Sequence, residues 1–203
     1  MGTTKRTAPQ ATVLVVDDER ETADLYTAFL AEEYTVRTAY SGSEALELVD
    51  EAVDMVLLDR KMAGIGGDEV LRTIRERAID CRVVMVTAIY PDLAVLDLPF
   101  DDYLVKPVSR EEIRAVVSAM CLRNSCDKTI QEVVALASKM ATIESKLRIE
   151  ELANSERYAA TEAQFNTLRA EAELGTPTDD LYKEFTVEKV RALFSTQNDA
   201  PQR

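Results

Sequence analysis

Five residues whose side chains could do chemistry follow short apolar runs rich in β-branched residues: Asp17, Asp18, Asp59, Thr87 and Lys106. The runs that precede them are Thr12 to Val16, Val53 to Leu58, Val83 to Val86 and Tyr103 to Val105. Such runs are typical of fully buried parallel strands. Open parallel sheets gather their working residues at the carboxyl ends of their strands, so we expect one shared pocket. Three acids, a hydroxyl and an amine in one pocket indicate a divalent metal beside a phosphoryl group.

The elements that must position these residues alternate between strands and helices along the chain. Two capping boxes, Ser41 with Glu44 and Ser109 with Glu112, predict helix starts. The whole order gives five strands and about five helices. It predicts an α/β fold, a flavodoxin-like, doubly wound, five-stranded parallel sheet. Two prolines interrupt the segment before the last strand, so the helix there should be short.

The composition of the 203-residue chain excludes several functions. Its net charge of −13 argues against binding nucleic acid, which needs clustered lysine and arginine. It has no histidine, and therefore no imidazole base, no His-Cys zinc site and no phosphohistidine of its own. A phosphoryl donor must be another molecule. Three cysteines do not make a disulfide framework. With no signal peptide and no apolar run approaching about 18 residues, we expect a cytoplasmic protein that does not enter a membrane.

The order of these motifs resembles the receiver domain of two-component response regulators. The resemblance runs from about Thr12 to Leu122. It rests on Val-Val-Asp-Asp-Glu at 15–19, Leu-Leu-Asp at 57–59, Val-Thr-Ala at 86–88 and Asp-Tyr-Leu-Val-Lys-Pro at 102–107. A member of this family accepts a phosphoryl group from a partner sensor histidine kinase. It assists its own phosphorylation and dephosphorylation but is not a dedicated enzyme.

The resemblance implies a Mg²⁺ site. Asp18 and Asp59 would ligate the ion directly, Asp17 would bind it through water, and the backbone carbonyl of Lys61 would complete the protein ligands. Mg²⁺ is a hard ion that prefers oxygen ligands and keeps several waters, which suits this set. Without a cation, three clustered acids would repel by roughly 4 kcal/mol per contacting pair. The metal-free pocket should therefore be less stable than the metal-bound one.

The resemblance also implies roles around the phosphoryl group. Asp59 would be the phosphoacceptor, Thr87 would hydrogen-bond a phosphoryl oxygen, and Lys106 would pair with the group through a cis peptide bond to Pro107. Tyr103 would be the aromatic residue that moves inward on activation. Phosphoryl transfer is mostly positioning and charge stabilisation, so this short set is chemically sufficient.

The sequence departs from the family pattern at Ala63 and again at Pro99-Phe100, which replaces the usual Gly-Ala before the last strand. Ala63 stands where the family usually has proline, which loosens the loop after the acceptor but leaves the chemistry intact. The glycines at 64, 66 and 67 fit no P-loop or dinucleotide-binding spacing, and we expect them to let this loop turn.

Simpler interpretations of the same residues remain. Adjacent acids such as Asp17 and Asp18 are commonly a solvated turn, and an acid after a strand, such as Asp59, is commonly a helix cap. Two other functions also fit the fold: an unphosphorylated scaffold, and a Mg²⁺-dependent phosphatase that works through an aspartyl-phosphate. A phosphatase of the haloacid-dehalogenase type needs its second acid two positions after the nucleophile, whereas Asp17 and Asp18 are adjacent. All five polar residues in the right order favour the receiver.

The chain divides into a polar tail at 1–10 that we expect to be disordered, the receiver at 11–122, and a helical, partly coiled-coil-like region at 123–203. Residues 128–174 contain no proline or glycine and predict one or two long helices, with a break near Asn154. Apolar residues at three-four spacing form a stripe typical of a coiled-coil seam: Val133, Leu136, Met140, Ile143 and Leu147.

The helical region resembles the HalX domain, which follows receivers in halophilic archaea, and that setting would account for the acidic surface. We expect it to dock an output protein still to be identified, or to form a homodimer through its apolar stripe. The alternative is a tail that folds back near residue 154 and buries the same stripe within one chain. The region carries no DNA-binding motif, so we expect no specific nucleic-acid binding.

Overall fold

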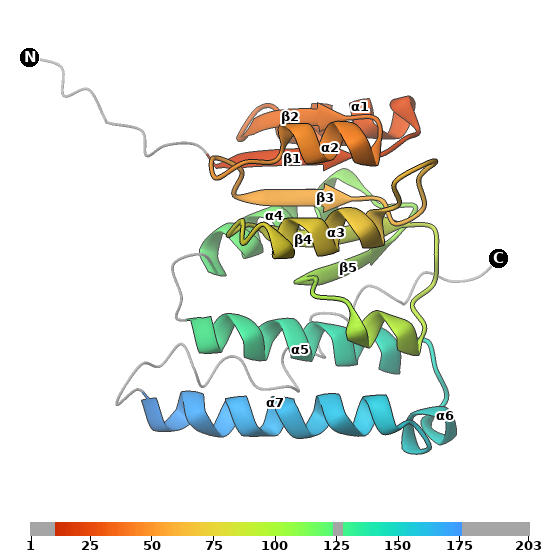
Figure 1. The fold of residues 1–203 in the computed structure, drawn as a ribbon, viewed down its shortest axis with the longest axis vertical. Coiled ribbons are helices and arrows are strands. Elements are labelled where there is room, and N and C mark those ends of the chain that lie inside the picture. The colour runs from red at the N-terminus through yellow and green to blue at the C-terminus, as the bar shows by residue number, and fades with distance from the viewer. Residues whose placement is uncertain (1–10, 124–127, 176–203) are drawn as a thin grey trace, which may run out of the picture. The chain divides into compact units, whose positions relative to one another are not determined.

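The computed structural model describes residues 11–123 and 128–175, so the segments at 1–10 and 176–203, the predicted disordered tail among them, lie outside the described residues. In the described part no helix is long and apolar enough to cross a membrane. The elements, labelled in Figure 1, are β1 (Thr12–Val16), α1 (Arg20–Leu30), β2 (Thr35–Ala39), α2 (Gly42–Leu48), β3 (Met55–Leu58), α3 (Gly67–Glu76), β4 (Arg82–Thr87), η1 (Leu93–Asp97), β5 (Asp102–Val105), α4 (Arg110–Arg123), α5 (Lys128–Glu144), α6 (Ile149–Ala153) and α7 (Glu156–Gly175).

The five strands form one sheet in the order β2-β1-β3-β4-β5. Strand β1 pairs in parallel with both β2 and β3, so Val13 lies opposite Val36 on one side and Met55 on the other. Strand β3 pairs in parallel with β4. The strand order reverses at β1, because β2 lies on one side of β1 and β3 lies on the other. The sheet is therefore doubly wound. The predicted fold class is confirmed.

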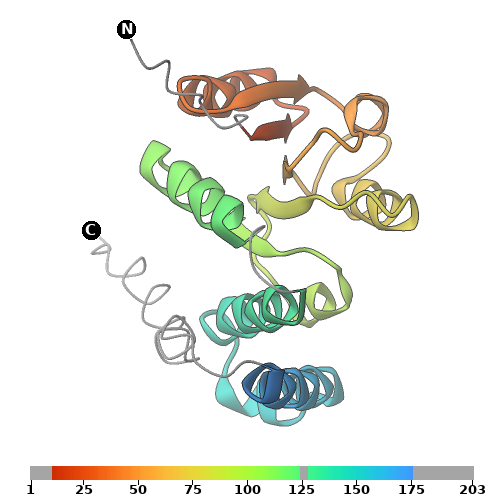
Figure 2. The ribbon, with the colours of Figure 1, turned by 90° about the vertical axis from the view of Figure 1, so that its left-hand side faces the viewer.

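Helices cover both faces of this sheet, as Figure 2 shows, with α1 and α4 on one face and α2 and α3 on the other. Along each strand successive side chains point to opposite faces, so one set of alternate residues packs against α1 and α4. The buried residues of that layer are Val13, Val15, Ala23, Tyr26, Leu30, Met55, Leu57, Val84, Val86, Ile113, Val116, Val117 and Met120. Strands buried on both faces explain the continuous apolar runs in the sequence.

Both predicted capping boxes start helices. The Ser41 hydroxyl accepts a hydrogen bond from the Glu44 amide (3.2 Å), while the Glu44 carboxylate accepts from the backbone of Tyr40 (2.8 Å), one residue before the cap. In the second box the Ser109 amide and hydroxyl each donate to Glu112 (2.7 Å). The short element expected before the last strand is the 3₁₀ helix η1.

The described residues fall into two compact units. Residues 11–88 and 104–122 form the first, which holds most of the sheet, and residues 89–103 join the C-terminal helices in the second. In the second unit α5 and α7 contact each other and both contact η1, and Figure 1 shows that α5 and α7 run antiparallel. Helix α6 ends at Ala153 and α7 begins at Glu156, which agrees with the break expected near Asn154. The turn between α5 and α6 was not predicted.

The apolar stripe runs along α5 and ends with Leu147, three residues after that helix, and most of it is covered within the chain. Leu136 and Met140 form a buried cluster with Phe165 of α7, and Val133 packs against it. Ile143 is fully buried and Leu147 is half-buried. This is the folded-back arrangement that the sequence left open, and self-association through the stripe stays a prediction.

Candidate functional site

The polar residues predicted to share a pocket lie at the carboxyl ends of the sheet strands. Asp17 directly follows β1, Asp59 follows β3, Thr87 ends β4 and Lys106 follows β5. Asp17, Asp59 and Thr87 are buried, with exposed fractions of 1%, 6% and 0%. One carboxylate oxygen from each of Asp17, Asp18 and Asp59 lies within 4.8 Å of the others. The three acids therefore converge on one small volume.

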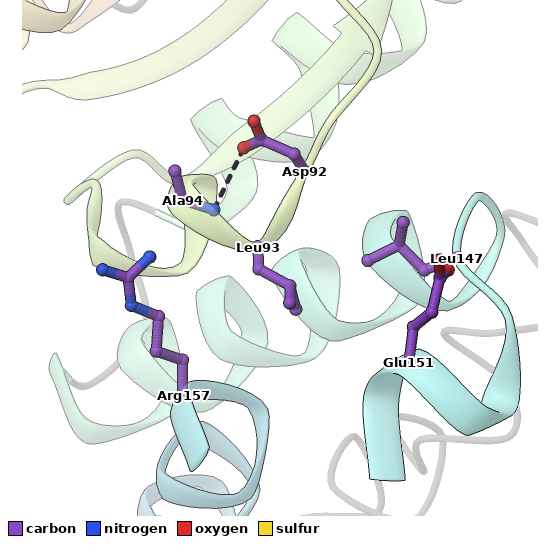
Figure 3. A pocket seen from close by; sticks show the side chains of 6 residues that line it. All are labelled: Asp92, Leu93, Ala94, Leu147, Glu151 and Arg157. Carbon is purple, nitrogen blue, oxygen red and sulfur yellow. Dashed lines mark hydrogen bonds between the residues drawn. The ribbon is translucent and has the colours of Figure 1, made fainter. Parts of the chain in front are cut away.

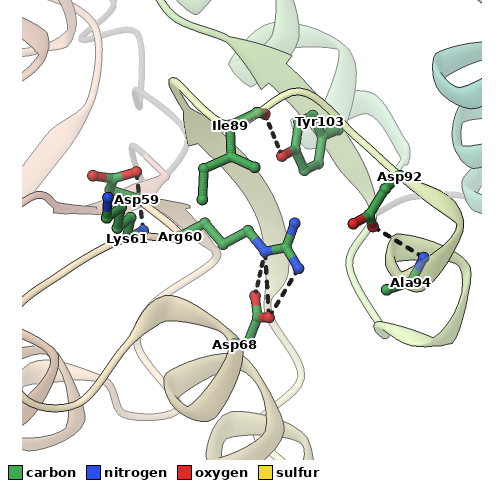
Figure 4. Close-up of polar contacts among 8 residues, drawn as sticks. All are labelled: Asp59, Arg60, Lys61, Asp68, Ile89, Asp92, Ala94 and Tyr103. Atoms are coloured by element: carbon green, nitrogen blue, oxygen red, sulfur yellow. Dashed lines mark hydrogen bonds and ion pairs between the residues drawn. The ribbon is translucent and has the colours of Figure 1, made fainter. Parts of the chain in front are cut away.

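Backbone amides hold the three carboxylates in place. The Glu19 amide donates to Asp17 Oδ1 (3.1 Å), and the Ala63 amide donates to Asp18 Oδ2 (2.9 Å). The Lys61 amide makes a longer contact with Asp59 Oδ1 (3.4 Å), drawn in Figure 4. Two of these donors belong to the loop between β3 and α3, so the conformation of that loop decides where two of the acids lie.

Lys106 supplies the positive charge of the pocket. Its Nζ lies 2.6 Å from Asp17 Oδ2 and 3.4 Å from Asp59 Oδ2. Its backbone amide donates to the carbonyl of Thr87 (2.9 Å), which fixes the end of the last strand against β4. The peptide bond between Lys106 and Pro107 is cis, as the family resemblance implied.

Burial and charge act in opposite directions on the ionisable groups. Burial raises the pKa of the Asp17 carboxyl, although the hydrogen bond and the charge of Lys106 act to lower it. Burial alone would lower the pKa of the Lys106 amine. The hydrogen bond to Asp17 and the charges of Asp59 and Asp17 outweigh that effect, so the pKa of Lys106 is raised. The amine therefore stays charged, and Asp17 ionises at an energetic cost that a second cation would relieve.

The donor set fits Mg²⁺. Carboxylate oxygens are hard ligands, and one exposed acid, Asp18, beside two buried ones leaves an open side on which the ion can keep its waters. Asp18, Asp59 and Asp17 would hold the ion. The proposed fourth ligand, the Lys61 carbonyl, belongs to an exposed residue in the same loop.

Residues 13–118 match the family model of the response regulator receiver domain, and residues 122–195 match that of the HalX domain. The chain belongs to the response regulator receiver family. The receiver is followed by a HalX domain, as the composition and placement of the helical region indicated.

Individual relatives agree. A protein of Haloferax volcanii provisionally named a transcriptional regulator is 43% identical over 167 residues, which cover 82% of this chain but 28% of that protein. The chain thus spans less than a third of this relative's length. Among solved structures, the BeF3-activated receiver domain of DrrB is 27% identical with a TM-score of 0.53, covering 56% of this chain and 99% of its own. A two-component response regulator from Clostridium difficile is 26% identical with a TM-score of 0.53, covering 58% and 100%.

The predicted switch residue of the receiver, Tyr103, lies in the other compact unit. It is buried, with an exposed fraction of 5%, and its hydroxyl donates to the carbonyl of Ile89 (2.7 Å; Figure 4). Its ring lies 5.7 Å from that of Phe100 in a tilted arrangement. Sequence reasoning did not anticipate these partners, because they come from a segment without regular periodicity.

A separate pocket lies in the second compact unit. A pocket of about 420 Å³ is lined by Asp92, Leu93, Ala94, Leu147, Glu151 and Arg157, as Figure 3 shows. Asp92 caps η1 by accepting from the Ala94 amide (3.0 Å). Of the residues singled out in the sequence, this pocket contains only Leu147, so it is separate from the acidic site.

Adding Mg²⁺ is expected to raise the unfolding temperature of the receiver. At about 100 times its Kd, a ligand that binds only the folded state stabilises it by about 2.7 kcal/mol. Asp18→Asn should lose most of this gain with little direct cost, because Asp18 is exposed. Thermal unfolding with Mg²⁺ and with a chelator measures the difference, and Asp24→Asn, outside the pocket, is the matched control. An equal Mg²⁺ effect in Asp18→Asn would contradict the assignment of this ligand.

Proposed function

We propose that this protein is a two-component response regulator that accepts a phosphoryl group on Asp59 from the phosphohistidine of a partner sensor histidine kinase. The observation that carries the proposal is the convergence of three carboxylates within 4.8 Å, with the Lys106 amine in contact with two of them. The DrrB receiver, whose structure is BeF3-activated, supports it as a relative of the same fold.

In this proposal each residue has a chemical task. A carboxylate oxygen of Asp59 attacks the phosphorus, the P–N bond to the donor imidazole breaks, and a P–O bond to Asp59 forms. Bound Mg²⁺ would neutralise charge on the phosphoryl oxygens. Lys106 would exchange its contact with Asp17 for one with the phosphoryl group, as a compact point charge. The Thr87 hydroxyl, fully buried at the end of β4, would donate to a phosphoryl oxygen. Transfer then depends on positioning and charge, and the protein acts as a signalling switch rather than a dedicated enzyme.

The kinase step is tested by phosphotransfer profiling. Purified sensor kinases from the native cell are autophosphorylated and each is mixed with this protein and Mg²⁺. We expect at least one kinase to lose its label to the wild-type protein within a short reaction time and to keep it with Asp59→Asn. If no kinase transfers its label, the proposal is wrong and the unphosphorylated scaffold is favoured. If Asp59→Asn accepts the label equally, Asp59 is not the phosphoacceptor and the proposal is also wrong.

The output route that we propose runs through the second compact unit. Its residues 89–103 are joined by peptide bonds to the pocket on both sides, two residues after Thr87 and three before Lys106. Within the unit these residues contact the C-terminal helices. Arg157 lies 3.4 Å from Asp97, and the Lys139 amine lies 4.9 Å from the ring centre of Phe100. A shift of the segment on phosphorylation would therefore act on α5 and α7.

Amide hydrogen exchange in α5 and α7 should change when beryllofluoride is added to the Mg²⁺-bound protein. Unchanged exchange would contradict this route.

The oligomeric state follows from how the helices are packed. In place of the homodimer expected from the sequence, we propose a monomer in which α5 and α7 form a hairpin, because α7 already covers Leu136 and Met140 of the stripe. Sedimentation of the full chain measures the oligomeric state. Dimerisation that is abolished by Met140→Glu while the receiver stays folded would contradict the hairpin and restore the predicted seam.

We also propose that the chain does not bind DNA by itself, on the basis of its net charge of −13. The name of the Haloferax relative does not bear on this directly, since the match covers 28% of that protein. Mobility-shift assays with genomic fragments at moderate salt test it, and a sequence-dependent shift would overturn it.

A further inference from the structure

An ion pair spans the loop that follows the phosphoacceptor. Arg60, the residue directly after Asp59, donates from Nε to both carboxylate oxygens of Asp68 (3.0 and 3.3 Å) and from Nη2 to one of them (3.2 Å), as Figure 4 shows. The pair is partly buried, with exposed side-chain fractions of 15% for Arg60 and 30% for Asp68. Two-pronged contacts of this kind fix orientation as well as distance.

The loop between these two residues carries the contacts to the acids. A backbone hydrogen bond joins the two ends of the loop: the Gly67 amide donates to the Arg60 carbonyl (2.9 Å). Between the ends lie Lys61 and Ala63, whose amides contact Asp59 and Asp18. Residue 63 is alanine, so the loop lacks the fixed backbone angle that a proline there would give. Asp68 stands in the first turn of α3, so the ion pair ties the loop to a helix.

We propose that Arg60 is a positioning residue. Its ion pair with Asp68 holds the loop backbone so that the Lys61 carbonyl and the Asp18 and Asp59 carboxylates bind Mg²⁺ together. Arg60 is engaged with Asp68 and acts through the loop, not as a charge on the phosphoryl group. This inference rests on the proposed function, since it concerns the same metal site.

The test measures Mg²⁺ affinity by calorimetry, and by displacement of Mn²⁺ followed by its magnetic resonance signal, in the full chain. Outer-shell groups around metals are worth about 10-fold to 100-fold in affinity, so Arg60→Ala and Asp68→Asn should each weaken Mg²⁺ binding by about tenfold. The double variant should be no weaker than either single one, because the two residues act as a unit. Arg37→Ala is the matched control. Arg37, on β2, pairs with Asp50 (3.0 Å), and its replacement should leave the affinity unchanged.

A second readout separates positioning from a general loss of structure. Phosphorylation of Arg60→Ala by a small acyl phosphate should be slow at low Mg²⁺ and return to the wild-type rate at saturating Mg²⁺. A deficit that persists at saturating Mg²⁺, unchanged Mg²⁺ affinity in both single variants, or additive losses in the double variant would each overturn the proposal. If Arg60→Ala does not fold, Asp68→Asn on the outer side of the pair decides the question. A wild-type protein that binds Mg²⁺ but accepts no phosphoryl group would reject the proposed function and leave the affinity comparison valid.

Discussion

Asp59→Asn is expected to reduce the rate of phosphoryl uptake by about 1,000-fold or more, the scale seen when a nucleophile is removed from a cooperating set. The amide has nearly the same shape as the carboxylate, and Lys106 keeps its contact with Asp17 (2.6 Å). The fold should therefore survive while the attacking oxygen is lost. The rate is measured with Mg²⁺ and a small acyl phosphate, by the intact mass of the protein over time.

The control for this variant is Asp24→Asn. Asp24 is exposed, accepts a hydrogen bond from the Tyr40 hydroxyl (2.8 Å), and lies outside the cluster of three acids. It should take up phosphate at the wild-type rate. A rate in Asp59→Asn within a few-fold of this control would show that another residue carries the phosphoryl group.

Gly67→Ala is expected to give the second large effect, a loss of about 3 kcal/mol in the free energy of unfolding, at the upper end of the cost of overpacking. A Cβ at this position would lie 2.2 Å from the carbonyl oxygen of Asp59 and 2.8 Å from the Arg60 Cα. Both are backbone atoms, so no side chain can turn aside. The backbone that carries the phosphoacceptor must move, and Mg²⁺ affinity should fall with stability.

The neighbouring glycine provides the matched control. At Gly66 the nearest atom to an added Cβ is the Arg60 carbonyl oxygen at 3.6 Å, an ordinary contact. Gly66→Ala should change the free energy of unfolding by about 0.5 kcal/mol or less. Chemical denaturation of the two variants side by side checks the pair. Equal stability in both would mean that the close approach at residue 67 is not a constraint.

The sheet and the acidic pocket could be predicted because their signals are local. Each strand between buried layers is an unbroken apolar run, and the polar residue after it marks the strand end, as Asp17 and Asp59 do. The parallel pairing then brings these ends together without further information. The capping boxes at Ser41 and Ser109 fixed two helix starts for the same reason, since a cap is a contact between residues three apart.

The contacts that were missed join residues whose spacing follows no period. Arg60 and Asp68 lie at the two ends of an irregular loop, and only their opposite charges hinted at a pair. The Tyr103 hydroxyl donates to the carbonyl of Ile89, which lies fourteen positions earlier in the chain. The stripe on α5 showed that an apolar face needs a cover, but three-four spacing is the same whether a second chain or α7 supplies it. The grouping of residues 89–103 with the C-terminal helices depends on tertiary packing, which no local pattern encodes.

The residue that carries the phosphoryl group can be located directly. The full chain is phosphorylated with Mg²⁺ and an acyl phosphate, the acyl phosphate on the protein is reduced with borohydride, and the modified residue is located by peptide mass spectrometry. If Asp59 is the phosphoacceptor, it will be the one modified position, and no position will be modified when Mg²⁺ is chelated. Modification at Asp17, Asp18 or a residue outside the pocket, or Mg²⁺-independent modification of Asp59, would contradict this prediction.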